Sequence, residues 1–367
     1  MPHKEKMHLR RATKLKRPQE PTRPYPYHEE EVSFENKTAR ITLSGTLTKP
    51  TGTGPFPAVL LIAGMGPNDR DYNNCNHKIF LVLADHLTRN NIAVLRYDKR
   101  GTGASTGTYD TTITSQDFAD DAHAGLDYLK TRPDITQNQI GLIGHSEGGM
   151  IASMITASSK DIAFLVIMAG ATITSIDNIV EQTGLQLRAD GASDALITQD
   201  RALRKQILTI VIQETNNDSA LKNMLKTVTN YWTELPEPLK KESSKHVFTF
   251  TQARAETMIN LFNSPWYRFF LNHNPIETLK KITIPVLVLN GDKDWITHAK
   301  MLTTINNTLK DAGNRDYKTI ELPDLNHQFR TCQTGAIKKY AMIEETIAPV
   351  VLNIISDWIL ERTINKK

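Results

Sequence analysis

The sequence predicts an α/β fold with a mostly parallel, doubly wound sheet and an inserted helical lid. Apolar runs of Val, Ile and Leu recur at strand length, for example at 57–63 and 92–98, and helix-like segments separate them. The runs are continuous rather than alternating, which indicates strands that helices bury on both faces. With 367 residues, of which 39% are hydrophobic, the chain is long enough to bury such a core.

The predicted elements follow one another in a regular order. Alternating residues from 31 to 50 predict an antiparallel strand pair that turns near Asn36 and Lys37. The buried strands that we expect after this pair lie at 57–63, 92–98, 140–146, 163–170, 284–294 and 317–323. The helices that we expect lie at 77–89, at 115–130, from 147 onward and at 336–362.

The strand series is interrupted once, after Ala171. Residues 172–275 are polar and helix-like, and their scattered aromatic residues are Trp232, Trp266, Tyr267, Phe269 and Phe270. The same kind of strand resumes afterwards, so this segment is an insertion rather than an independent domain, and we expect it to form a lid beside a ligand site. The core then consists of a first part at 25–171 and a second part at 276–367.

Residues 1–24 form a basic leader. They contain eight Lys or Arg against Glu5 and Glu20, a net charge of +6, whereas the whole chain has a net charge of +4. The leader lacks the apolar core of a signal peptide, so we expect a disordered, solvated arm. A cytoplasmic location follows for the sequence as it stands, with the periplasm as the alternative if the native leader differs. No aromatic interleaving or basic face follows, so no nucleic-acid partner is expected.

Two further features are not expected. The longest apolar runs are strand-length and fall short of the roughly 18–20 residues that a membrane-spanning helix needs. Cys75 and Cys332 lie far apart and fit neither a metal-binding spacing nor a disulfide framework. We therefore expect no membrane span and two free thiols.

The segment GHSEG at 144–148 matches the G-x-S-x-G pattern at the point where a buried strand gives way to a helix. A turn this sharp strains the backbone of the serine and exposes its hydroxyl above the sheet. Ser146 is therefore a candidate nucleophile, with a structural turn as the alternative. A serine acts only with a histidine base and an acid that orients it. His145 is expected to be a packed neighbour.

Asp294 and His327 are the candidate partners of this serine. Asp294 lies just past the strand that ends at Asn290, and His327 lies in the loop after the last strand. With Ser146 they give the chain order nucleophile, acid, base, and all three follow strands at the sheet edge where open α/β sheets bind ligands. Asp292 lies in the same turn and is the competing acid, with a turn or capping role as its other interpretation.

Two backbone N–H groups are candidates for an oxyanion hole. One is that of Glu147 at the start of the helix, and the other is that of Met65 in the loop AGMGPNDRD. Residues 69–71 of this loop are expected to pin it through ion pairs. The Gly-rich turn at 96–105 lacks the full G-x-G-x-x-G pattern, so no nucleotide site is expected there. No metal or organic cofactor is required, because nucleophile, base and oxyanion donors are all protein groups.

Six segments within residues 25–362 together carry a resemblance to a known family. They are GMGPNDRD, LADHLTRNNIAVLRYDKRGTGAS, GLIGHSEGGMIA, SPWYRFF, LNGDKD and LNHQF. Together they resemble the bacterial α/β-hydrolase esterases of the Est10 and EstD type, and RYDKRGTG and GHSEGGMIA in series with GPNDRD are the most specific. The resemblance implies the α/β-hydrolase fold, the nucleophile Ser146, the acid Asp294, the base His327 and an oxyanion hole formed by the amides of Met65 and Glu147.

The chain departs from the family pattern in two places. Family members often begin with an export signal, whereas this chain has the basic leader. After GDKD, the residues Trp295, Ile296 and Thr297 replace an expected Gln and Val, which alters the pocket wall.

The function that we expect is a serine carboxylesterase acting on small, short-acyl esters through an acyl-enzyme. The same three residues also suit an aminopeptidase, a thioesterase or an acyltransferase. A catalytically silent binding protein is the alternative from a different class, because a fold alone does not fix a function.

Overall fold

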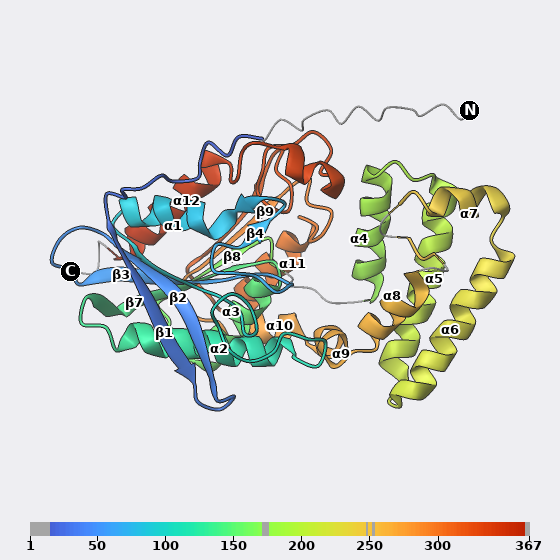
Figure 1. Cartoon of the computed structure of the whole chain (residues 1–367), viewed down its shortest axis with the longest axis horizontal. Coiled ribbons are helices and arrows are strands. Elements are labelled where there is room, and N and C mark those ends of the chain that lie inside the picture. Colours follow the sequence, from blue (N-terminus) through green and yellow to red (C-terminus); the bar gives the residue numbers. More distant parts are fainter. Residues whose placement is uncertain (1–14, 171–175, 247–248, 252–253, 364–367) are drawn as a thin grey trace, which may run out of the picture.

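The computed structural model describes residues 15–170, 176–246, 249–251 and 254–363. Its centre is an eight-stranded sheet with the strand order β1-β2-β6-β3-β7-β8-β9-β10 (Figure 1). β2 is antiparallel to β1 and β6, and all other neighbours in this sheet are parallel. The predicted mostly parallel sheet, with an antiparallel pair at its beginning, is therefore confirmed.

The strands of this sheet have the following bounds in chain order: β1 His28–Asn36, β2 Ile41–Lys49, β3 Phe56–Ile62, β6 Ala93–Tyr97, β7 Ile135–His145, β8 Phe164–Met168, β9 Val286–Gly291 and β10 Tyr317–Leu322. β4 (Asn73–Asn74) and β5 (His77–Lys78) form a separate short hairpin. The carboxyl ends of β7, β9 and β10 lie on one edge of the sheet, because these strands run in the same direction.

Helices cover both faces of the sheet. Those on one face are α1 (Ile79–Arg89) and α12 (Pro349–Thr363), and those on the other are α2 (Ser115–Lys130) and α3 (Glu147–Ser158). Successive residues of β3 point to opposite faces, so Val59 and Leu61 join the apolar cluster under α1 and α12. Leu60 and Ile62 join the cluster under α2 and α3. This is why the strand reads as a continuous apolar run.

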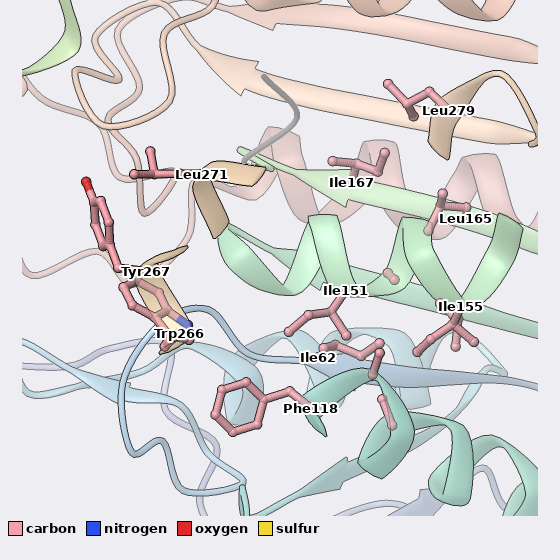
Figure 2. Packing of buried hydrophobic residues seen from close by; sticks show 14 of the residues in the cluster. Ile62, Phe118, Ile151, Ile155, Leu165, Ile167, Trp266, Tyr267, Leu271 and Leu279 are labelled. Atoms are coloured by element: carbon pink, nitrogen blue, oxygen red, sulfur yellow. The ribbon is translucent and has the colours of Figure 1, made fainter. Parts of the chain in front are cut away.

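Figure 2 shows the second of these clusters from close by. Ile151 and Ile155 of α3 lie between Ile62 of β3 and Leu165 of β8. All four side chains are at least 97% buried. Their burial fixes α3, and with it the strand-to-helix turn that precedes it, against the middle of the sheet.

The described part of the chain between β8 and β9 consists of helices and the connections between them. Its helices are α4 Ile176–Ala189, α5 Asp194–Gln213, α6 Asn217–Glu234, α7 Glu237–Ser243, α8 Ala255–Phe262, α9 Pro265–Asn272 and α10 Pro275–Leu279. Helices α4 to α8 stand to one side of the sheet and its covering helices, and α9 and α10 lead back to the sheet (Figure 1). No helix in the described ranges is both long and apolar enough to cross a lipid bilayer.

Two helix predictions need correction. A helix not expected from the sequence, α11 (Met301–Asp311), connects β9 to β10. The single C-terminal helix expected at 336–362 is divided into a 3₁₀ helix at Ile337–Met342 and α12 from Pro349. The division has a local cause, because a residue before proline avoids the helical conformation, and Pro349 suits the first position of α12.

The basic leader is described only from residue 15 onward, and residues 1–14 lie outside the described part of the chain. Arg17 donates to the backbone carbonyls of Asn76, Ala341 and Ile343. Gln19 donates to the carbonyl of Ile347 and accepts from its N–H. These two side chains therefore hold the described part of the leader against the fold, where the sequence predicts a free arm. For residues 1–14 the free arm stays a prediction.

Candidate active site

Ser146 lies at the junction of β7 and α3. β7 ends at His145 and α3 begins at Glu147, so the turn consists of Ser146 alone. Its backbone has φ 57° and ψ −124°, a conformation that costs an L-residue on the order of 1–3 kcal/mol. The hydroxyl makes no capping bond to α3. Ser146 therefore stands in the strained elbow that the G-x-S-x-G pattern predicts.

The elbow has room only for glycine at two positions. A Cβ atom at Gly144 would lie 2.1 Å from the carbonyl oxygen of Gly148, and one at Gly148 would lie 2.0 Å from that of Ile62. Any side chain at either position would push α3 away from β7 or β3. The two glycines are therefore what allows the helix to start directly after the strand.

The structure brings Asp294 and His327 together. Nδ1 of His327 lies 2.8 Å from Oδ2 of Asp294, and the two residues are 3% and 0% exposed. A carboxylate accepts, so Nδ1 carries the hydrogen and Nε2 keeps the lone pair that a general base uses. Asp294 comes from the loop after β9 and His327 from the loop after β10, as the sequence predicts.

The turn after Asp294 supports its carboxylate. Oδ1 accepts from the N–H groups of Ile296 at 2.8 Å and Thr297 at 2.9 Å, and the Thr297 hydroxyl lies 2.7 Å from Oδ2. Burial alone would raise the pKa of Asp294, but the charge and hydrogen bond of His327, with the bonds from Thr297, outweigh it. The pKa therefore lies below its ordinary value, and Asp294 is ionised at neutral pH.

The competing acid, Asp292, lies elsewhere in the turn. Its backbone N–H donates to the carbonyl of Leu322 at 3.0 Å. Its Oδ1 is buried and has no hydrogen-bond partner within the described ranges. The carboxylate that meets the imidazole of His327 is thus that of Asp294.

His145 links the loops that carry the candidate groups. Its Nε2 lies 2.8 Å from the carbonyl oxygen of His327, and its Nδ1 lies 3.1 Å from the hydroxyl of Tyr72. A carbonyl only accepts, so Nε2 carries the hydrogen and Nδ1 accepts from Tyr72. Burial lowers the pKa of His145 to about 3, with the charge of His327 acting in the same direction. We had expected only a packed neighbour at this position.

The loop after β3 comes close to the nucleophile. A Cβ atom at Gly64 would lie 2.9 Å from Cβ of Ser146, so the next residue, Met65, borders the serine. Met65 and Glu147 line the same pocket as Ser146. Within the described residues, the N–H of Met65 has no backbone acceptor. Glu147 is the first residue of α3, so its N–H has no acceptor within the helix. The amides of Met65 and Glu147 therefore both lie beside Ser146 and remain the candidate donors of an oxyanion hole.

The same loop is pinned by buried ion pairs. Arg70 meets Asp98 through Nη2 at 2.8 Å, and its own N–H donates to Oδ1 of Asp98 at 2.7 Å. Asp71 pairs with Arg96. Asp69 instead accepts from the N–H of Asn73 at 3.1 Å. The predicted ion pairing is therefore confirmed for Arg70 and Asp71, whereas Asp69 closes a turn.

Ser146 opens into a pocket of about 210 Å³. The helices between β8 and β9 supply much of the wall, with Ile179 from α4 and with Trp266, Tyr267 and Phe270 from α9. Figure 2 shows Trp266 and Tyr267 projecting from α9 at the end of the apolar cluster. Ile296 and Thr297 complete the wall beside Asp294. The pocket is therefore lined mainly by apolar and aromatic groups.

Glu147 is the one lining residue of this pocket with an acidic side chain. Its Oε1 accepts from the Ser115 hydroxyl at 2.7 Å and from the indole N–H of Trp266 at 2.8 Å. Its Oε2 lies 3.7 Å from Nζ of Lys99. The side chain of Glu147 is 97% buried. Two neutral donors bind one of its oxygens, and the ammonium group of Lys99 balances its charge.

The sequence interpretation missed several contributors to the site. Lys99 and Tyr72 gave no signal, because a lysine or tyrosine in a loop has no characteristic spacing. Thr297 was expected only to alter the pocket wall, and it also donates to the carboxylate of Asp294. Trp266 was noted only as one of the scattered aromatic residues of the insertion, and its bond to Glu147 joins segments 119 positions apart. The described residues contain no group of three His, Cys, Asp or Glu side chains arranged to hold a metal ion.

Comparison with known proteins gives a family match over most of the chain. The model of the family described as X-Pro dipeptidyl-peptidase (S15 family) matches residues 39–327. Esterase EstD of Thermotoga maritima is 26% identical over 330 residues, which are 90% of this chain and 68% of that protein. Acyl-coenzyme A thioesterase 3 of Mus musculus is 30% identical over 136 residues, 36% of this chain and 27% of that protein.

Solved structures share the fold. The ferulic acid complex of Est1E from Butyrivibrio proteoclasticus has a TM-score of 0.54 at 15% identity and covers 91% of this chain and 100% of that chain. A Pyrococcus furiosus esterase, Pf2001, has a TM-score of 0.52 at 16% identity, with 92% and 90% covered. At these identities the likeness concerns the fold, and the predicted α/β-hydrolase fold is confirmed.

Proposed function

The chain belongs to the family described as X-Pro dipeptidyl-peptidase (S15 family), and from this premise we propose that it is a serine carboxylesterase for small, uncharged, short-acyl esters. It is a serine hydrolase on the α/β-hydrolase fold. The proposal therefore concerns which bond it cleaves and which residues do so. We assign Ser146 as nucleophile, His327 as base, Asp294 as acid, and the N–H groups of Met65 and Glu147 as oxyanion donors.

In this mechanism, Nε2 of His327 removes the proton from the Ser146 hydroxyl, and the resulting oxygen attacks the ester carbonyl. The N–H groups of Met65 and Glu147 stabilise the negative oxygen of the tetrahedral intermediate. His327 then protonates the leaving alcohol, and a water molecule that it activates hydrolyses the acyl-enzyme. Asp294 stabilises the imidazolium in both halves of the reaction.

The residues that line the pocket support an ester rather than a peptide as the substrate. Removing a dipeptide from a chain end requires recognition of the substrate's terminal ammonium group, for which a buried site uses an unpaired carboxylate. Glu147 is the one acidic residue in the described lining. Lys99 already balances its charge, and Ser115 and Trp266 already donate to it. An uncharged substrate meets no such requirement.

The size of the pocket supports short acyl chains. A volume of about 210 Å³ lies below the roughly 300–1,000 Å³ typical of sites for drug-sized ligands. Residues of α4 and α9 close one side of it, which supports a lid role for the insertion that we expected at 172–275. The small pocket therefore favours acetyl and butyryl esters over esters of long acyl chains.

Parallel assays of wild type and Ser146→Ala test this proposal. We expect turnover of p-nitrophenyl acetate that falls with acyl length and is lost in Ser146→Ala. An aminoacyl-prolyl anilide and an acetyl thioester, assayed at equal concentration, represent the peptidase and thioesterase alternatives. A higher kcat/KM on either of these than on the acetate ester, or ester turnover in Ser146→Ala at the wild-type rate, would overturn it.

A further inference from the structure

A buried lysine lies beside the proposed site but takes no part in the mechanism above. Lys99 follows β6 in the turn after Asp98 and is 2% exposed. Lysine is among the residues least often fully buried, and it is buried when its ammonium group has defined partners. Burial lowers the pKa of Lys99, and the neighbouring Glu147 opposes the shift.

Within the described residues, the ammonium group of Lys99 meets a carbonyl, a carboxylate and the rings of Phe118 and Tyr109. Nζ donates to the backbone carbonyl of Gly64 at 2.6 Å and lies 3.7 Å from Oε2 of Glu147. It also lies 4.2 Å from the centre of the Phe118 ring. Oε2 of Glu147 is buried and has no hydrogen-bond partner within the described chain. The short, charge-assisted bond of Lys99 is therefore the one to Gly64.

This carbonyl belongs to the same peptide group as the N–H of Met65. In a planar trans peptide the C=O and N–H bonds point in opposite directions. A donor that holds the carbonyl of Gly64 therefore also fixes the direction of the Met65 N–H. Asn68 adds a second bond to the same oxygen at 2.9 Å. A cationic donor on the carbonyl further polarises the peptide and makes its N–H a stronger donor.

We propose that Lys99 is a positioning residue for the oxyanion hole, which it serves by orienting and polarising the Gly64–Met65 peptide. The inference rests on the proposed function, in which the N–H of Met65 stabilises the reaction's negative oxygen. The pairing with Glu147 connects the same ammonium group to the residue that supplies the second donor. The ammonium group of Lys99 thus binds the peptide that carries one proposed donor and pairs with the side chain of the residue that carries the other.

A purely structural role for Lys99 makes a different prediction. If the lysine served only to neutralise Glu147, removing both charges together would leave catalysis intact. If Lys99 positions the Met65 N–H, activity is still lost when both charges are removed. The loss then appears in kcat, because the transition state is destabilised and the bound substrate is not.

The experiment compares Glu147→Gln with the double variant Lys99→Met/Glu147→Gln, so that no unpaired charge is buried in the second protein. The control is Lys49→Met, which removes a partly buried lysine that forms ion pairs outside the proposed site. Thermal unfolding verifies that each protein folds. The readouts are kcat and KM for p-nitrophenyl acetate, the rate of Ser146 phosphonylation by a fluorophosphonate, and the affinities of a trifluoromethyl ketone and its methyl ketone analogue.

We expect the double variant to lose at least about tenfold in kcat relative to Glu147→Gln, and up to the roughly 10²–10³-fold seen when one oxyanion donor is lost. KM and methyl ketone affinity should stay within about threefold, while phosphonylation and trifluoromethyl ketone affinity fall with kcat. Lys49→Met should match the wild type.

A folded double variant whose kcat and phosphonylation rate equal those of Glu147→Gln would overturn the role of Lys99. So would a loss that appears in KM alone. Failure of the proposed function gives a separate result: the wild type would then lack Ser146-dependent ester turnover, and the phosphonylation rates would still decide whether Lys99 acts on the oxyanion hole.

Discussion

The imidazole of His145 donates through Nε2 to the backbone carbonyl of His327 at 2.8 Å. The residue before the proposed nucleophile thereby holds the loop that carries the proposed base. The hydrogen on Nε2 leaves Nδ1 to accept from Tyr72. This arrangement requires a neutral imidazole, because a protonated ring has no acceptor for the tyrosine.

His145 should make the stability of the protein depend on pH. Its pKa is lowered by burial to about 3, so below about pH 6.5 the unfolded chain binds a proton that the folded protein does not. The folded state therefore loses about 1.4 kcal/mol per pH unit as the pH falls from 6.5 toward 4. Urea denaturation of wild type and His145→Gln at pH 7.5, 6.0 and 4.5 measures this contribution.

The difference in unfolding free energy between wild type and His145→Gln should shrink as the pH falls below 6.5. At pH 7.5 it reports only the packing and hydrogen bonds that the variant loses. A difference that is the same at all three pH values would show that His145 does not remain neutral in the folded protein.

Asp294→Asn should lower kcat by about 10³–10⁴-fold with little change in KM, because an amide no longer stabilises the imidazolium of His327. Asp292→Asn is the matched control, two positions earlier in the same turn, and should retain activity within a few fold. Steady-state kinetics on p-nitrophenyl acetate compares them. Equal losses in the two variants would contradict the assignment of Asp294 as the acid.

Trp266→Phe should destabilise the protein by about 1.5–3 kcal/mol, because the buried carboxylate of Glu147 loses the indole donor. Trp232→Phe, on α6 and outside the pocket lining, should change the unfolding free energy by only about 0.5 kcal/mol. Urea titration gives both values. If the two substitutions cost the same, the bond between α9 and Glu147 does not stabilise the fold.

The sheet was predictable because its signal is local and repeated. Buried parallel strands are continuous apolar runs, and β3, β6, β8, β9 and β10 all lie at or within the predicted segments. The division of the C-terminal helix was not predicted, since the periodic residues on both sides of the break suit a helix. Its cause, Pro349 at the start of α12, is present in the sequence.

The candidate residues of the site could be selected for a similar reason. Ser146, Asp294 and His327 each follow a strand, and the parallel sheet brings such ends to one edge. Lys99 and His145 could not be selected, because their roles depend on which backbone carbonyl each side chain reaches. That information is contained in the packing of loops and not in any spacing along the chain.

The most direct test of the account is the site of covalent labelling by a fluorophosphonate, determined by peptide mass spectrometry alongside loss of ester turnover. We predict one phosphonyl group, on Ser146, with labelling and inactivation proceeding at the same rate and no labelling of Ser146→Ala. Labelling of another residue that accompanies the loss of activity, or full ester turnover by Ser146→Ala, would contradict the assignment of Ser146 as the nucleophile.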